Sequence, residues 1–195
     1  MPTTLNVSWC LTKKSAKNTG TVVRSSTGSN CWPQGNDPII YLHARLGKGG
    51  LETIKRAGTS SQTPIISLSP KDCLYVGERK SETDFRNGFQ GASRYKWLKD
   101  LGPGQHLISL IFRLGGNQYK DSGTGKNRDR QSLEFILVWH YLQKYNADFF
   151  TGSTSGRPGC LKFVGGYQFS SPLLRSTIYS HRDQIVQKVN ALWGI

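Results

Sequence analysis

The chain has 195 residues, with 26 Lys and Arg against 12 Asp and Glu, which gives a formal net charge of +14. Its length is sufficient for a hydrophobic core that needs no disulfide bond or metal ion to hold it together. Its content of 11% aromatic residues excludes a chain that is disordered throughout. The charge predicts a polyanionic partner, either nucleic acid or an anionic surface. With no membrane-length apolar run, no leader-like start and no cysteines at metal-ligand spacing, we expect a cytoplasmic protein without membrane contact or a cofactor of its own.

Short apolar segments separated by clusters of Gly, Pro, Ser and Asn are predicted as strands. They cover residues 5–11, 39–43, 64–68, 73–76, 107–114, 133–142 and 161–164. This pattern predicts a mainly β fold, either a barrel or a sandwich. Residues 133–145 also place apolar side chains at helical spacing, so a helix is the alternative for that segment.

The C-terminal region predicts a helix over residues 181–193, with Ser180 as its N-cap and Asp183 near its positive end. Shorter helices are predicted over residues 51–57 and 93–101. Because no domain-sized linker interrupts the chain, we predict one domain over residues 1–195. Its β core spans 1–145, and 146–195 form a C-terminal extension.

Three polar segments, residues 13–36, 78–99 and 115–130, are predicted as long loops, and such loops inside a compact domain are usually functional or disordered. Residues 1–36 hold four cations and no acid, whereas residues 71–100 hold seven cations and five acids. Lys and Arg bind phosphates, while Arg, Asn, Gln and carboxylates read base edges. Glu82 and Asp84 would oppose a polyanion, so their presence among cations favours base reading.

Two short motifs suggest nuclease chemistry instead. Glu78-Arg79-Lys80 matches the ExK of metal-dependent nucleases, which needs an earlier aspartate on a neighbouring strand. Asp72 falls on the same predicted strand, and Asp37 lies far upstream. Tyr75-Val76-Gly77 resembles one half of the GIY-YIG nuclease pattern. The other half would be Ile39-Ile40-Tyr41, which lacks the Gly and ends 34 positions before Tyr75, a longer spacing than in that family.

Two parts of the chain resemble the DNA-contacting arms of a known domain. The first is Ser15-Ala16-Lys17-Asn18-Thr19-Gly20, after a predicted strand. The second combines Leu74-Tyr75, Arg79, Phe85-Arg86-Asn87 and Arg94-Tyr95-Lys96-Trp97, before the predicted strand at 107–114. In order and character, over residues 5–142, they resemble the N-terminal effector-binding domain of EcoRII-type restriction endonucleases. That domain belongs to the plant B-three-like DNA-binding superfamily.

The resemblance implies a seven-stranded open pseudobarrel with short helices, here with an added C-terminal helix. It implies sequence-specific binding of double-stranded DNA by the effector, or target-recognition, domain of a bacterial Type II (IIE) restriction endonuclease. The implied target is of CC(A/T)GG type. In monomeric, UbaLAI-like enzymes such a domain is coupled to a separate nuclease domain. We therefore expect a monomeric, non-catalytic chain, with Mg²⁺ needed only where a nuclease domain is attached.

By position, the resemblance implies DNA-binding roles for residues of both arms and of the third basic loop. They are Lys17, Asn18, Arg24, Ser26, Asn30, Arg79, Lys80, Glu82, Asp84, Arg86, Asn87, Gln90, Arg94, Lys96 and Lys126. Arg86 and Asn87 are expected to read bases, and the lysines to bind phosphate. Two alternatives stay open. In the first alternative, the chain is itself a small Mg²⁺-dependent nuclease. In the second, it binds nucleic acid without sequence preference through charge and aromatic stacking.

Overall fold

A computed structural model describes residues 5–14, 20–28, 31–46, 73–90, 101–122, 127–145 and 172–193. The strands are β1 (Asn6–Lys14), β2 (Gly20–Ser25), β3 (Ile39–Leu46), β4 (Cys73–Arg79) and β5 (His106–Arg113). The helices are α2 (Glu82–Gln90), the short 3₁₀ turn η2 (Asn117–Tyr119), α4 (Arg128–Tyr145) and α7 (Pro172–Trp193).

The described strands form one open antiparallel sheet of five strands in the order β2-β1-β5-β3-β4, so the predicted mainly β fold is confirmed. The two inner strands β5 and β3 are buried along nearly their whole length. This burial explains why their sequences are almost continuously apolar, since a strand covered on both faces has no solvent side to place polar residues on.

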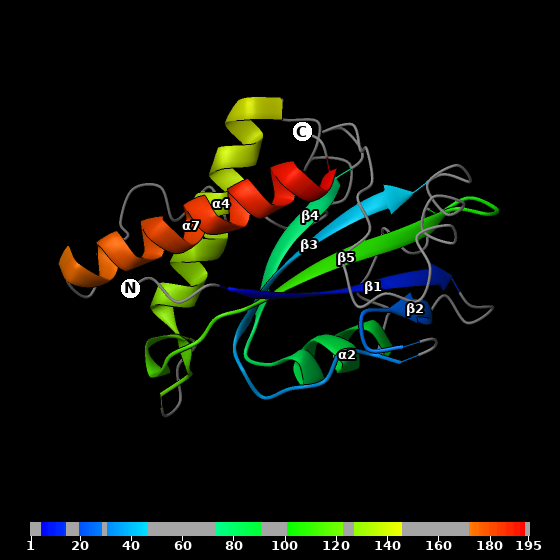
Figure 1. Ribbon diagram of the computed structural model, residues 1–195, viewed down its shortest axis with the longest axis horizontal. Coiled ribbons are helices and arrows are strands. Elements are labelled where there is room, and N and C mark those ends of the chain that lie inside the picture. Colours follow the sequence, from blue (N-terminus) through cyan, green and yellow to red (C-terminus); the bar gives the residue numbers. More distant parts are fainter. Residues whose placement is uncertain are drawn as a thin grey trace.

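Helices cover both faces of the sheet, as Figure 1 shows. On one face, α4 and α7 pack against apolar side chains such as Trp9, Leu42 and Leu110, and this cluster is the larger core. On the opposite face, α2 places Phe85 against Tyr41 and Ile111 in a smaller core. α2 contacts both β2 and β4, so it links the two described edges of the sheet.

α7 is longer than the predicted helix over residues 181–193. It begins at Pro172, because proline fits the first turn of a helix, where its missing N–H needs no partner. Ile178, Ile185 and Val189 are all buried in the larger core, so the apolar stripe starts one turn before residue 181. The prediction of Ser180 as the N-cap was therefore wrong, since Ser180 lies inside the helix.

α4 corrects the predicted strand over residues 133–142, and the helical alternative is confirmed. Asn127 caps this helix, because its side-chain Oδ1 accepts a hydrogen bond from the Arg130 backbone N–H at 2.9 Å. Leu133 and Leu137 then lie one turn apart on the face that is buried against the sheet. The N-cap and the single apolar stripe favour a helix here, although the apolar run alone is also typical of a strand.

Parts of the predicted loops are also regular structure. Residues 13–36 include the end of β1 and all of β2, residues 78–99 include the end of β4 and all of α2, and residues 115–130 include η2 and the start of α4. The many polar residues on these elements obscured the apolar spacing from which strands and helices are predicted. The predicted strands at 64–68 and 161–164, the helix at 51–57 and most of that at 93–101 lie outside the described residues. Within the described ranges, no helix has the length and apolar character needed to span a membrane.

Candidate nucleic-acid interface

The pairing of β3 with β4 brings two distant sequence motifs together. Tyr41 lies directly opposite Gly77, and His43 lies opposite Tyr75. Ile39-Ile40-Tyr41 and Tyr75-Val76-Gly77 therefore lie on adjacent antiparallel strands and meet at the Tyr41–Gly77 pair, although residues 47–72 separate the strands in the chain. Distance along the sequence is thus no obstacle to the two motifs acting as one unit.

Tyr41 lies fully buried beneath a cationic side chain. Its ring centroid is 4.9 Å from that of Phe85 on α2, in an edge-on arrangement, and 4.8 Å from that of His43. The Arg79 guanidinium carbon lies 5.7 Å from the Tyr41 ring centroid, within range of a cation–π interaction. The Arg79 side chain keeps about a quarter of its surface exposed, so it is the group of this stack that reaches solvent.

His43 is held as a neutral imidazole. It is fully buried, and its Nδ1 lies 2.8 Å from the Ser109 hydroxyl oxygen on β5. Burial holds the pKa of His43 well below its usual value of 6.5, and the nearby positive charge of Arg79 lowers that pKa further. The Ser109 hydroxyl satisfies one ring nitrogen, which a buried polar group requires.

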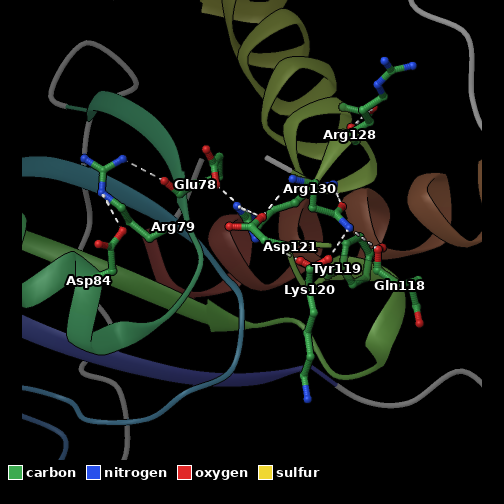
Figure 2. Close-up of polar contacts among 11 residues, drawn as sticks. Glu78, Arg79, Asp84, Gln118, Tyr119, Lys120, Asp121, Arg128 and Arg130 are labelled. Atoms are coloured by element: carbon green, nitrogen blue, oxygen red, sulfur yellow. Dashed lines mark hydrogen bonds and ion pairs between the residues drawn. The ribbon is translucent and has the colours of Figure 1, made fainter. Parts of the chain in front are cut away.

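The start of α2 places further polar groups beside Arg79. Ser81 is the N-cap of α2, because its hydroxyl oxygen accepts a hydrogen bond from the Asp84 N–H at 3.1 Å. This cap sets Asp84 so that its carboxylate lies 3.9 Å from Arg79 Nε, as Figure 2 shows. Lys80, between the strand and the helix, is exposed. The junction of β3, β4 and α2 therefore combines partly exposed cations with one partly exposed carboxylate.

Glu82 has a different environment from Asp84. Its side chain is fully buried and forms an ion pair with Arg113 of β5. The backbone of Gly35 crosses directly above it, and a Cβ atom at Gly35 would overlap the Glu82 carboxylate. The N–H of Thr83 donates to the Gly35 carbonyl oxygen at 3.4 Å, which fixes this crossing. In the free protein Glu82 thus joins α2 to β5 and the segment before β3.

Glu78 takes part in a buried network on the opposite face of β4. Its carboxylate accepts from Arg130 Nε at the start of α4, and Arg130 also donates to the Tyr119 carbonyl oxygen at 2.9 Å and to Asp121 at 2.8 Å. Figure 2 shows Arg130 at the centre of these contacts, with Lys120 and Arg128 directed away from it. Because Arg130 is only 2% exposed, its guanidinium serves this network and does not face solvent, unlike the exposed Lys120 of the same segment.

The remaining predicted residues fall into three groups. Ser26, after β2, exchanges hydrogen bonds with the backbone of Trp9, and Arg24 of β2 is partly exposed. Asn87 on α2 is exposed, and Arg86 beside it is partly buried, with an Nε that has no hydrogen-bond partner in the described structure. Several others lie outside the described residues, namely Lys17, Asn18, Asn30, Arg94, Lys96 and Lys126, as does the side chain of Gln90.

Sequence reasoning missed the roles of His43, Ser109 and Arg130. No local signal in the sequence marks the cross-strand contact of His43 with Ser109. Alternation within β4 could have shown that Glu78 and Arg79 point to opposite faces. Among the described residues, no three His, Cys, Asp or Glu side chains gather in a way that would hold a metal ion.

Comparison with protein-family models, with curated proteins and with solved structures gives no match to this chain. The resemblance to restriction-enzyme effector domains therefore stays a prediction.

We predict that replacing Arg130 by Met destabilises the protein by about 3–5 kcal/mol, because the buried carboxylate of Glu78 then loses its partner. The double variant Glu78→Gln, Arg130→Met should lose less than the sum of the single changes, measured by urea unfolding. Arg182→Met is the control, since its pair with Asp183 is solvent-exposed and worth about 1 kcal/mol or less. Additive effects of Glu78→Gln and Arg130→Met would contradict the pairing.

We also predict that acid weakens the fold through His43. Its folded pKa is lowered, so the unfolded chain binds a proton that the folded chain excludes. The stabilisation is complete above pH 6.5, the usual His pKa, and is lost as pH falls below it, by up to about 1.4 kcal/mol per pH unit. His43→Asn should reduce this slope between pH 6.5 and 5. An unchanged slope in urea unfolding would show that His43 does not titrate in this way.

Proposed function

We propose that this chain is a metal-dependent nuclease acting on double-stranded DNA, with its site where β3, β4 and α2 meet. One observation carries the proposal. The two halves that resemble the GIY-YIG nuclease pattern lie on paired strands and meet where Tyr41 is opposite Gly77. Strand pairing removes the objection that the halves are far apart in sequence, although the first half still lacks the Gly of the pattern.

The chemistry of the junction supports phosphodiester cleavage. Hydrolysis builds negative charge on the phosphate oxygens, and a preorganised cation stabilises that charge. Arg79 is such a cation, because the ring of Tyr41 lies beneath it and Asp84 lies beside it. Exposed Lys80 next to it adds a phosphate contact. The net charge of +14 would draw the chain to DNA.

A nuclease of this kind would use Mg²⁺, which proteins commonly hold through one or two carboxylates together with substrate phosphates. Glu78 and Glu82 are each engaged by a buried or partly buried arginine, which disfavours the ExK assignment. Asp84 at the start of α2, a partly exposed carboxylate beside Arg79, is the group at this junction that fits better.

The test is cleavage of supercoiled plasmid DNA with Mg²⁺ or with EDTA. Wild-type protein should cleave only with the metal. Arg79→Ala should slow cleavage by about 100-fold, the usual cost of losing one group that stabilises the transition state. Asp84→Asn tests the metal carboxylate, since it should abolish cleavage while duplex binding persists.

The matched control is another stacked Arg–Tyr pair among the residues that the structure describes. On α7, the Arg182 guanidinium lies 4.8 Å from the ring centroid of Tyr179, far from the proposed site in sequence. Arg182→Ala and Tyr179→Phe should cleave at the wild-type rate. Wild-type protein that leaves DNA intact with Mg²⁺ and Mn²⁺, while remaining folded, would contradict the proposed function.

Sequence-specific recognition of a CC(A/T)GG-type duplex, as a restriction-enzyme effector domain, is a second candidate. It is favoured by the position of Arg86 and Asn87 on α2, because a helix fits the major groove and these residue types read guanine and adenine there. The finer fold prediction, a seven-stranded pseudobarrel, belongs to this candidate. It would require the strands predicted at 64–68 and 161–164 to extend the five-stranded sheet.

Competition between a CC(A/T)GG duplex and a scrambled duplex tests this candidate at about 150 mM salt, where nonspecific binding is weak. A specific reader should prefer its site by well over about tenfold, and Arg86→Ala should cost about 1–3 kcal/mol and relax one base position. Lys120→Ala is the control, since Lys120 is exposed and its side chain is directed away from Arg130 in Figure 2. Equal affinity for both duplexes would reject sequence reading.

A further inference from the structure

A row of polar residues crosses the α2 face of the sheet. Strand register places Cys10 of β1, Ser109 of β5 and His43 of β3 side by side, and all three are fully buried. On β5, the positions two residues before and after Ser109 are Leu107 and Ile111, which belong to the smaller apolar core. Polar groups buried among apolar side chains cost free energy unless they are hydrogen-bonded, so this row depends on its internal contacts.

Ser109 links the other two members of the row. Its hydroxyl oxygen lies 2.8 Å from His43 Nδ1, and strand register places it opposite Cys10 on its other side. Burial raises the pKa of Cys10 to about 12, so this thiol stays neutral, and burial likewise keeps His43 neutral. The hydrogen bond to Ser109 fixes the orientation of the His43 ring, because rotating the ring would leave a buried nitrogen without that partner.

The oriented His43 ring in turn contacts the ring that lies beneath Arg79. The centroids of His43 and Tyr41 are 4.8 Å apart, and Phe85 lies 5.9 Å from His43 and 4.9 Å from Tyr41. These three rings pack together in a core without exposed surface. A continuous set of contacts therefore runs from Ser109 in the middle of the sheet, through His43 and Tyr41, to the guanidinium of Arg79.

We propose that His43 and Ser109 are positioning residues for this site. Their hydrogen bond holds the Tyr41 ring in place, and that ring sets where Arg79 meets a phosphate of the DNA. This inference rests on the proposed nuclease function. Displacing a catalytic group by about 1 Å commonly costs about 100-fold in rate, so loss of the Ser109 hydroxyl should be felt in the chemical step and not in DNA binding.

The test compares three variants in single-turnover cleavage with Mg²⁺, and in duplex binding with Ca²⁺ in its place. Ser109→Ala should lower the cleavage rate by about tenfold or more without changing the dissociation constant for DNA. Ser109→Thr, which keeps the hydroxyl, should restore most of that rate. Cys10→Ala is the control, because it removes a buried side chain of the same row, opposite Ser109 on the side away from His43, and it should lower stability without slowing cleavage.

Two results of this comparison would overturn the proposal. One is Ser109→Ala cleaving at the wild-type rate, and the other is Cys10→Ala slowing cleavage as much as Ser109→Ala, which would indicate general loosening of the core. Wild-type protein that does not cleave at all would instead contradict the proposed function. In that case the ¹⁵N NMR signals of His43 still test the positioning role. We expect one neutral tautomer in the wild type and a mixture in Ser109→Ala, and a mixture in the wild type would overturn the proposal.

Discussion

The buried guanidinium of Arg130 is the contact that joins the helical layer of this protein to the edge of its sheet. It reaches the carboxylate of Glu78 at the end of β4, the carbonyl oxygen of Tyr119 in η2 and the carboxylate of Asp121. Burying these charges is costly, and only their mutual contacts offset the cost. The end of β4, the η2 turn and the start of α4 are therefore fixed relative to one another.

The position of Glu78 also determines which side chain β4 directs towards its opposite face. Side chains alternate along a strand, so a β4 whose Glu78 is held towards α4 must direct Arg79 towards α2. There Arg79 lies over the ring of Tyr41 and beside Asp84. The edge strand thus has one side that serves stability and one side that forms the candidate site. This division explains why two consecutive charged residues have unrelated environments, one 6% exposed and the other partly open to solvent.

The parts of the fold that could be predicted are those where the pattern is local. Alternation and apolar runs located β1, β3 and β5, and helical spacing located α7. The pairing of β3 with β4 could not be predicted, because residues 47–72 separate the strands and no local signal specifies the partner. The charged run from Glu78 onwards resembled a solvated loop. The sequence does not show that Glu78 and Glu82 are paired with Arg130 and Arg113, because these arginines come from distant elements.

The candidate site was predicted in part. Arg79, Lys80 and Asp84 do gather at one junction, while Glu82 lies beneath it in an ion pair with Arg113. The groups that connect the site to the sheet, His43 and Ser109, gave no signal because their contact depends on register across β3 and β5. Tertiary pairing thus determines which of the many polar residues face the junction.

The most direct test of the central claim is a crystal structure of the chain bound to a DNA duplex with Ca²⁺, which supports binding without rapid cleavage. The account predicts a backbone phosphate within hydrogen-bonding distance of the Arg79 guanidinium, at the junction of β3, β4 and α2. A duplex bound elsewhere on the protein, with this junction facing away from every phosphate, would contradict it.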